Sequence, residues 1–441
     1  MARKVKQFDQ LRELYGELET VDFDKVDIVV LEEIVEKVSG VSDPRDESYV
    51  KHKLADIIMI VFFAVLAGAN EWEEIEIFGK TKASWFKKFL ELPYGLPTDD
   101  TYRLVISKIN VNYVYSIVTD LLMKKLEEIL QLIESPFERQ ADIISLDGKE
   151  SRGSKRKEAV RAEVKPLNTL SAYSDNLGIC LDQEFIDDKT NEIPAMPVLL
   201  KRLDIKGAVV TCDALNTQTA TATAVIKGGG DYVMALKGNH KNLLNDTKDY
   251  FDEETRAEFI SQERDVVKTG QKPARYVRTT EKEHSSIVTR EYYLEANIEW
   301  LYGREEWAGF KSIGMVRKTI QPLKPDEPAK YEDRYYISSL TDVSMFARAV
   351  RSHWGVENCL HWQLDYTFGD DHNNTTKSNG AEGLQIFKKL ALTLLKFAQA
   401  VYPKRTSLKH IRYGLTISFE REIERIFTAF NVRRLAGLDG L

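Results

Sequence analysis

Apolar residues in the first 140 positions recur at the three- and four-residue spacing of amphipathic helices. The spacing is clearest in LADIIMIVFFAVLAG, ASWFKKFLEL and VYSIVTDLLMKKLEEIL. The most apolar run, residues 57–68, is 12 residues long, whereas a membrane-spanning helix needs about 18 or more. We therefore predict a helical N-terminal domain over residues 1–140, with this run as a buried core helix and with no membrane partner.

One helix start in this region is marked by Pro97, Thr98 and two aspartates, Asp99 and Asp100. Thr98 is suited to be the N-cap, and acidic residues in the first turn favour the helix dipole. Two interpretations remain open at this point: a DNA-reading helical unit, or an ordinary helical domain.

The pattern changes at Ala141. The segments DIISLDGK, LNTLSAYSD and GICLDQEFID predict three strands, and GAVVTCD and DYVMAL predict two more. Between the last three strands, IPAMPVLLKRLDI and QTATATAVIKGGG predict helices. This order predicts an α/β fold, with a mixed sheet covered by helices, whose first part spans residues 141–238.

Residues 239–342 start helical and acidic and then alternate with a period of two in ARYVRTTEKEH, SSIVTREYYLEA, FKSIGMVRKT and DRYYISSL. Such alternation is typical of antiparallel strands, so we predict a β-rich insertion into the α/β domain. Helical spacing returns over residues 343–441, through HWGVENCLHWQLD and residues 381–400. This last segment is predicted to complete the α/β domain and to form a C-terminal tail.

The composition is 43% hydrophobic and 30% charged over 441 residues, which excludes collagen-like and wholly disordered chains. Cys180, Cys212 and Cys359 lie far apart without a CxxC pair, so neither a disulfide framework nor a thiolate zinc site is indicated. The N-terminus has no apolar run of signal-peptide type. We expect a cytoplasmic protein.

The net charge of −7 counts against a simple nucleic-acid coat. Basic residues nevertheless gather in residues 149–165 and 404–412, while acidic residues gather in residues 17–36 and 246–254. Because charge is segregated, a local DNA-binding groove is compatible with the composition, and its affinity is expected to depend on salt.

Three acidic residues are candidates for metal chemistry. Asp147 follows IISL and Asp213 follows AVVTC, so both are expected at the carboxyl ends of strands, where open α/β sheets place ligands. Glu357 lies in the helix after the insertion. Together they would suit two Mg²⁺ or Mn²⁺ ions, which prefer oxygen ligands and promote phosphodiester cleavage. An aspartate after a strand is more often a cap or turn residue, so the spacing alone leaves both interpretations open.

The sequence as a whole resembles the cut-and-paste DDE transposases of bacterial insertion sequences, in the H-repeat-associated (Rhs-element) subgroup. Eight stretches carry the resemblance, in the family's order, between about residues 43 and 396: LADIIMIVFFAVLAGANEWEEIEIFG, LPTDDTYRLV, SLDGKESRGS, KTNEIPAMPVLLKRLDIKGAVVTCDA, GGGDYVMALKGNHKNL, YYISSL, RSHWGVENCLHWQLDYTF and FKKLALTLLK.

This resemblance implies a ribonuclease-H-like catalytic core interrupted by the β-rich insertion. It assigns the catalytic and metal-binding roles to Asp147, Asp213 and Glu357, with two Mg²⁺ ions for which Mn²⁺ can substitute. The implied activity is that of a transposase and endonuclease, which cuts double-stranded DNA at terminal inverted repeats and joins the 3′-OH ends to target DNA. A homodimer in the synaptic complex and an association with the nucleoid when DNA is bound are also implied.

The helix around Glu357 departs from a pattern common in the wider superfamily. At the positions where that pattern has Tyr and Arg, this chain has Val350 and His353. His353, Glu357, His361 and Asp365 instead recur every four residues and share one helix stripe. The stripe alone is compatible with a zinc or di-iron site, or with a polar interface that binds no metal of its own.

We predict DNA contacts from residues around these carboxylates. Trp354 and Trp362 would either stack on an unpaired base or anchor their helix to the sheet. The polar loop around residues 373–377 is a weaker candidate. The predicted DNA-binding set is Lys149, Arg152, Lys237, Asn239, Arg351, His353, Trp354, His361 and Trp362.

Two other functions compete with transposition at this stage. One is a domesticated protein that binds DNA without transposing it, and the other is a metal-dependent DNA nuclease that cuts but does not join. Three intact acidic residues argue against a pure binding protein, because binding alone needs no cluster of repelling carboxylates.

Overall fold

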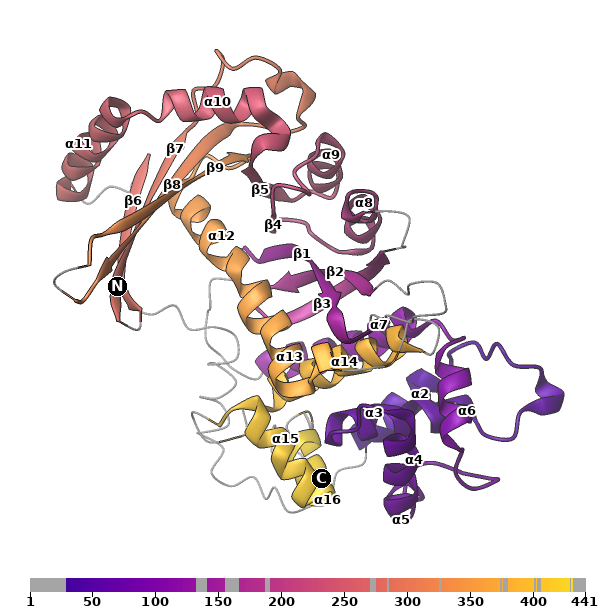
Figure 1. Cartoon of the computed structure of the whole chain (residues 1–441). Helices are drawn as coiled ribbons and strands as arrows, with labels where there is room; N and C mark the ends of the chain where they lie inside the picture. The colour runs from indigo at the N-terminus through magenta and orange to yellow at the C-terminus, as the bar shows by residue number, and fades with distance from the viewer. Residues whose placement is uncertain are drawn as a thin grey trace, which may run out of the picture.

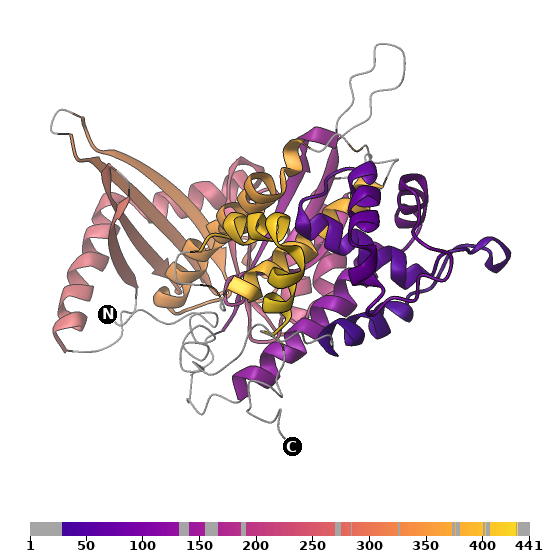
Figure 2. The same cartoon turned by 90° about the horizontal axis from the view of Figure 1, so that it is seen from below.

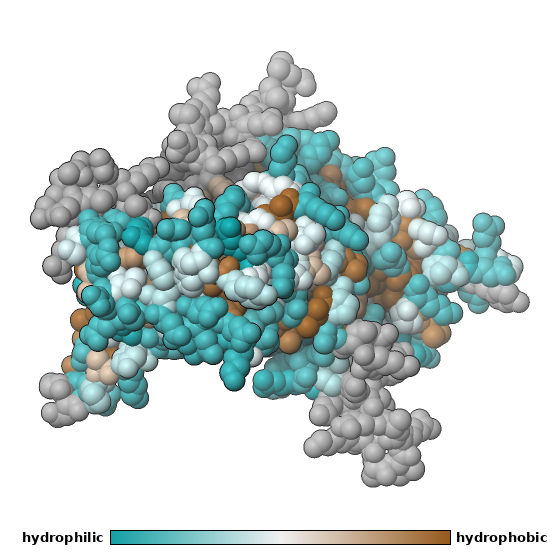
Figure 3. Space-filling model, turned by 90° about the horizontal axis from the view of Figure 1, so that it is seen from above, coloured by the Kyte–Doolittle hydropathy of each residue, from teal (hydrophilic) through white to brown (hydrophobic). Residues whose placement is uncertain are grey.

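The computed structural model describes residues 29–131, 141–154, 166–186, 191–269, 275–283, 285–324, 327–372, 375, 380–399, 402, 406–428 and 430. It has a mixed α/β architecture, which agrees with the α/β class that was predicted. Helices lie on both faces of a sheet that runs through the molecule, and an N-terminal group of helices packs at one end (Figure 1). The face seen in Figure 3 is mainly hydrophilic, with small apolar patches.

Nine strands form this sheet in the order β3-β2-β1-β4-β5-β9-β8-β7-β6. β1 pairs in parallel with β4, and β4 pairs in parallel with β5, while the other neighbours are antiparallel. The strands are β1 (Ile143–Ser151), β2 (Leu167–Ser174), β3 (Ile179–Ile186), β4 (Val209–Cys212), β5 (Asp231–Leu236), β6 (Tyr276–Glu283), β7 (Ser286–Glu295), β8 (Ser312–Pro322) and β9 (Lys330–Ser338).

β1 corrects one prediction. Asp147 was expected where its strand ends, but β1 continues to Ser151 because it stays paired with β2. The parallel pairing of β1 with β4 does end at Leu146 and Cys212. Asp147 and Asp213 are therefore the residues that follow the last parallel pair, and they lie at one edge of the parallel part of the sheet.

Alternation along the core strands explains why both faces are covered. Ile144 and Leu146 belong to an apolar cluster with α8 (Glu192–Arg202) and α9 (Thr219–Lys227). Ile143 belongs to the cluster formed with α12 (Val343–Gly355) on the other face. Successive side chains of a strand point to opposite faces, so a strand whose apolar residues point both ways needs helices on both sides.

The insertion is joined to this core through its strands. β9 pairs with β5 from Val233 opposite Ser338 to Leu236 opposite Tyr335. β8, β7 and β6 then extend the same sheet, and α10 (Lys241–Tyr250) and α11 (Glu253–Thr269) lie along this part (Figure 1). The predicted β-rich segment is thus continuous with the core sheet.

Helices from the two ends of the described chain share one apolar core. All 14 residues of α3 (Leu54–Ala67) are buried, as predicted for the most apolar run. The Phe63 ring lies 6.1 Å from those of Phe419 and Phe427 on α16 (Phe419–Thr428). Figure 2 shows the C-terminal helices between the insertion and the N-terminal helices. The other helices here are α2 (Val29–Ser39), α4 (Trp72–Thr81), α5 (Ala83–Phe86), α6 (Asp99–Ile106), α7 (Val111–Gln131), α14 (Ala381–Ala398) and α15 (Leu408–Ile417).

Thr98 is the N-cap of α6, as predicted, with Asp99 and Asp100 in the first turn. The cap hydrogen bond has a different source, because Glu76 of α4 accepts the Asp99 N–H at 2.7 Å. Among the described helices, none is by itself long and apolar enough to cross a membrane; α3 and α4 meet that test only as a pair bent by 100°.

Candidate active site

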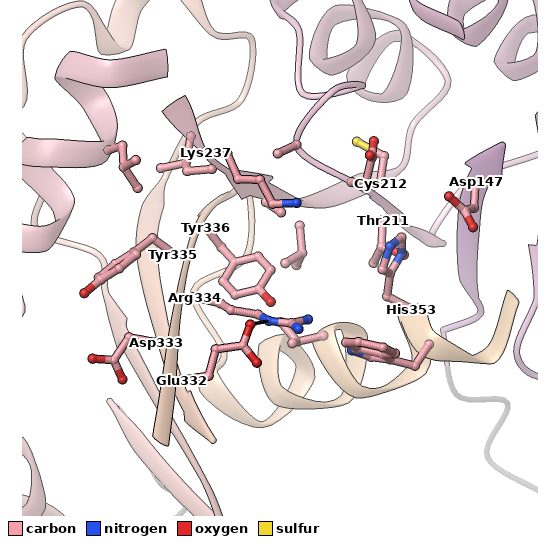
Figure 4. Close-up of a pocket in the computed structure, with 18 of the residues that line it drawn as sticks. Asp147, Thr211, Cys212, Lys237, Glu332, Asp333, Arg334, Tyr335, Tyr336 and His353 are labelled. Carbon is pink, nitrogen blue, oxygen red and sulfur yellow. Dashed lines mark hydrogen bonds and ion pairs between the residues drawn. The ribbon is translucent and has the colours of Figure 1, made fainter. Parts of the chain in front are cut away.

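The three predicted carboxylates line one pocket of about 670 Å³. Figure 4 shows this pocket, with Asp147 labelled. Asp147 comes from β1, Asp213 follows β4, and Glu357 comes from a π-helical segment, η5 (Val356–His361). Such segments are rare and often occur at functional sites. The predicted long helix is therefore α12, then η5, then α13 (Trp362–Phe368).

The environment of Asp147 in this pocket disfavours its charged form. The pKa of Asp147 is raised to about 7. Burial is the largest cause, and the neighbouring carboxylates of Glu357, Asp213 and Glu192 add to it. Because a nearby cation would favour the ionised form, this environment suits a positively charged ligand.

A fourth carboxylate, Glu192, was not among the predicted site residues. Its Oε2 accepts a hydrogen bond of 2.6 Å from the Asn216 side-chain amide, and the same amide donates to Asp213 Oδ1 at 3.0 Å. The Asn216 backbone N–H also donates to Asp213 Oδ1. Glu192 is the first residue of α8, inside the stretch KTNEIPAMPVLL. An acidic residue at the start of a helix is common, so nothing in the local sequence indicated that Glu192 would lie near Asp213.

The donors fit a hard divalent cation in their chemistry, since carboxylate oxygens are the ligands that Mg²⁺ and Mn²⁺ prefer. Within the described ranges, no group of three or more His, Cys, Asp or Glu side chains is arranged to hold one ion already. That finding applies equally to the three predicted carboxylates and to the stripe on the helix.

The stripe faces the sheet as one polar interface. His353 Nδ1 lies 3.0 Å from Thr211 Oγ1, His361 Nδ1 lies 3.5 Å from Asp147 Oδ2, and Asp365 Oδ1 accepts from Lys149 Nζ at 2.7 Å. Burial lowers the pKa of His353 to about 4 and that of His361 to about 3. Both imidazoles are thus neutral near pH 7, and His361 contacts Asp147 without an ion pair.

Lys149 does not enter the carboxylate pocket. Its ammonium is buried between Asp365 and Asp371, at 2.7 and 3.5 Å. The Arg152 backbone N–H donates to Asp371. These residues line a second, open hollow of about 480 Å³ beside the first. A phosphate contact by Lys149 would have to compete with two carboxylates.

The other predicted DNA contacts are distributed around the pocket. Lys237 and Trp354 line it, whereas the Asn239 side chain donates to the Ala214 carbonyl at 2.7 Å and holds the segment after β4. Arg351 lies 3.6 Å from Glu281 of β6. Trp362 is 49% exposed and stacks on Tyr366 at 4.5 Å, so it does not anchor the helix in the core.

Two predicted basic clusters and one loop are only partly described. Residues 155–165, 403–405, 373–374 and 376–379 lie outside the described residues. Of the second basic cluster, Lys409 lies over the Tyr366 ring at 4.3 Å and Arg412 is buried, where its guanidinium donates to the carbonyls of Val65 and Leu66.

Comparison with known families identifies the chain. The family profile described as "Transposase DDE domain" matches residues 138–394, more than half of the chain. The chain belongs to the DDE transposase family. A second profile, described as "DDE_Tnp_1-associated", matches residues 35–120.

Similar proteins in Escherichia coli indicate which group of transposases within the family this chain resembles. It is 33% identical over 374 residues to "Putative transposase YncI" of strain O157:H7, covering 83% of this chain and 88% of that protein. It is 31% identical over 369 residues to "H repeat-associated putative transposase YhhI" of strain K12, covering 83% and 90%. These similarities confirm the predicted resemblance to H-repeat-associated transposases of the insertion-sequence type.

Proposed function

We propose that this DDE transposase cuts double-stranded DNA at the terminal inverted repeats of its insertion sequence and joins the exposed 3′-OH ends to target DNA. The observation that supports this most directly is the convergence of Asp147, Asp213 and Glu357 on one pocket. Three separate parts of the chain bring carboxylates together, although burial and then the neighbouring carboxylates raise the pKa of Asp147.

We also propose that β1–β5 with α8, α9 and α12 form a ribonuclease-H-like core. Its strand order, β3-β2-β1-β4-β5, with β1, β4 and β5 parallel, supports this assignment. The aspartates then lie beyond the last parallel pair, which is the edge where sheets of this kind place ligands.

In the proposed reaction, Asp147, Asp213 and Glu357 hold the metal, and Asn216 orients the Asp213 carboxylate. Two Mg²⁺ or Mn²⁺ ions would, when bound, activate the attacking oxygen and neutralise the leaving oxygen. In the first step water attacks the terminal phosphodiester, and the bond to the 3′ oxygen breaks to leave a 3′-OH. In the second, that hydroxyl attacks a target phosphodiester and displaces another 3′-OH. Neutral His361 lies against Asp147 and limits its movement.

The test is a cleavage and strand-transfer assay on labelled duplexes taken from the DNA that flanks the gene, with Mg²⁺, Mn²⁺ or EDTA. Asp147→Asn and Glu357→Ala should reduce cleavage by a factor on the order of 10³ or more, because each removes charge that the transition state needs. End binding should persist in both. Glu73→Ala, on the exposed side of α4, is the control.

The same assay separates the alternatives. Metal-dependent cleavage without joining would indicate a nuclease, and tight end binding without cleavage under any metal would indicate a domesticated binding protein. Because two ends must be processed together, we further propose a homodimer on end DNA, which light scattering of the DNA complex would measure.

The N-terminal helices stay a proposed second DNA-contact region. Since α3 is wholly buried, deletion of this region would disrupt the core. A substitution of the exposed Leu104 on α6 by Glu tests end binding while leaving that core in place.

A further inference from the structure

The β-rich insertion supplies one wall of the carboxylate pocket. Tyr336 and Tyr335 of β9 lie opposite Ala235 and Leu236, the last paired residues of β5. Arg334 is the next residue of β9, so it lies beside the segment that follows β5, where Lys237 is found. Both Arg334 and Lys237 line the pocket that contains Asp147, Asp213 and Glu357.

The Arg334 guanidinium is held in place by its neighbours. It lies over the Trp354 ring of α12, with 4.7 Å from its central carbon to the ring centroid. Its Nε donates to Glu332 Oε1 at 2.8 Å. Figure 4 shows the group between Tyr336 and His353, with its nitrogens directed into the pocket. A guanidinium stacked by its face keeps donors in its plane for an oxyanion.

The cationic side chains of the pocket come from its β5–β9 side. The core contributes the carboxylates of Asp147, Asp213 and Glu357. The β5–β9 side contributes the cations Lys237, Lys248 and Arg334, together with Glu332 and Asp333, which pair with Arg334 and Arg317. A ligand that suits both sides has two anionic groups. One would bind the metal ions that the carboxylates hold, and the other would bind the cationic side chains. A DNA backbone has this chemistry, because it carries one negative phosphate per nucleotide.

We propose that Arg334 binds a DNA backbone phosphate adjacent to the scissile one, and that this is a DNA-positioning role of the insertion at the active site. The proposal rests on the function proposed above. It assigns to a residue of β9 a contact that His353, which lines the same pocket, does not supply through Nδ1, since that atom lies 3.0 Å from Thr211 Oγ1.

A neighbouring arginine provides a matched control. Arg317 of β8 also lies over an aromatic ring, that of Tyr331 at 4.8 Å, and pairs with Asp333 at 2.7 Å. It does not line the carboxylate pocket as described. Substituting either arginine by Gln therefore removes one charge and one cation–π contact, but only Arg334 itself lines the pocket, whereas Arg317 is connected to it only through its partner Asp333.

The experiment measures binding of a labelled duplex, taken from the DNA that flanks the gene, to full-length protein in EDTA over a range of NaCl concentrations. Arg334→Gln should weaken binding about tenfold and reduce the slope of log affinity against log salt by about 1, as expected for one lost phosphate contact. Arg317→Gln should keep the wild-type slope. Equal slopes and affinities for the two variants would overturn the proposal.

Two further measurements keep the result interpretable. If Arg334→Gln melts below the wild-type protein, Arg334→Met, which retains the apolar stem against Trp354, gives the same comparison and must lower the slope. Cleavage in Mg²⁺ is scored separately. A wild-type protein that binds with a steep salt slope but never cleaves would contradict the proposed transposition, while the Arg334 and Arg317 slopes would still decide the phosphate contact.

Discussion

The carboxylate of Glu192 lies directly over the α-carbon of Gly148, so that a methyl group added there would come within 2.5 Å of the Glu192 Cδ. Gly148 follows Asp147 in the sequence, and Glu192 is joined through Asn216 to Asp213. The absence of a side chain at position 148 thus allows the fourth carboxylate to approach two of the three predicted metal ligands.

Gly148→Ala should therefore displace Glu192 and loosen the support of Asp213. We expect metal-dependent cleavage to fall by a factor on the order of 10, with less than about 1 kcal/mol lost from the free energy of unfolding, because the added Cβ meets only the end of the flexible Glu192 side chain, which can move. Cleavage assays and urea unfolding measure the two effects. Gly40→Ala, where an added Cβ meets only the Lys37 carbonyl at 3.4 Å, is the control. Wild-type cleavage by Gly148→Ala would show that the position of Glu192 is unimportant.

The raised pKa of Asp147 makes the stability of the metal-free protein depend on pH. In the folded state this carboxyl has a pKa of about 7, whereas the ordinary value for aspartate is 3.8. Between these two pH values the folded state binds more protons than the unfolded state, so the free energy of unfolding falls as pH rises. Relative to Asp147→Asn, the wild-type protein should lose about 2–3 kcal/mol between about pH 5 and pH 8 in EDTA.

Mg²⁺ should reverse this trend, because it binds the ionised carboxylates. The rise in melting temperature caused by Mg²⁺ is expected to grow from about pH 6 to pH 8 in the wild-type protein and to be small in Asp147→Asn. Thermal unfolding followed by circular dichroism measures both. A Mg²⁺ effect that is independent of pH would argue against Asp147 as a ligand.

A buried ion pair beside the site should be important for stability. Lys388 Nζ lies 3.3 Å from Asp370 Oδ1, both side chains are buried, and Asp370 also accepts from Ser151. Lys388→Met should cost about 3–5 kcal/mol, because it leaves a carboxylate buried without its cation. Urea unfolding would measure the loss, with the exposed Lys124→Met as control. Adding Asp370→Leu to Lys388→Met should recover part of the loss.

The shared core of the N- and C-terminal helices predicts that they unfold together. Phe419 is buried and contacts the rings of Trp85 and Phe78 at 5.0 Å, whereas Ile417, two residues earlier, is 70% exposed. Phe419→Ala should cost about 3–5 kcal/mol in unfolding free energy, and Ile417→Ala less than about 0.5. If Phe419→Ala left the unfolding midpoint unchanged, the C-terminal helices would be dispensable for that core.

Local patterns in the sequence were sufficient to predict the buried helix α3, the succession of core strands and helices along the chain, and the strand-associated positions of Asp147 and Asp213. They were insufficient wherever a contact depends on elements far apart in the chain. Glu192 reaches Asp213 through Asn216, and Arg334 reaches the pocket through the pairing of β9 with β5. Lys149 was predicted to contact DNA phosphate because it is basic and follows Asp147 closely. Its burial between Asp365 and Asp371 could not be predicted, because it depends on how the segment after Glu357 packs on β1.

The pairing of β9 with β5 also has a consequence for how this chain acquires its structure. The outer edge of β5 is covered only by a strand that is synthesised after the 93 residues from 237 to 329. Until then that edge carries unpaired backbone N–H and C=O groups, which can template association between chains. Contacts this distant in sequence form slowly. Nascent or truncated chains that end before β9 are therefore expected to aggregate, so that the protein becomes both catalytically competent and aggregation-resistant only after its insertion has been made.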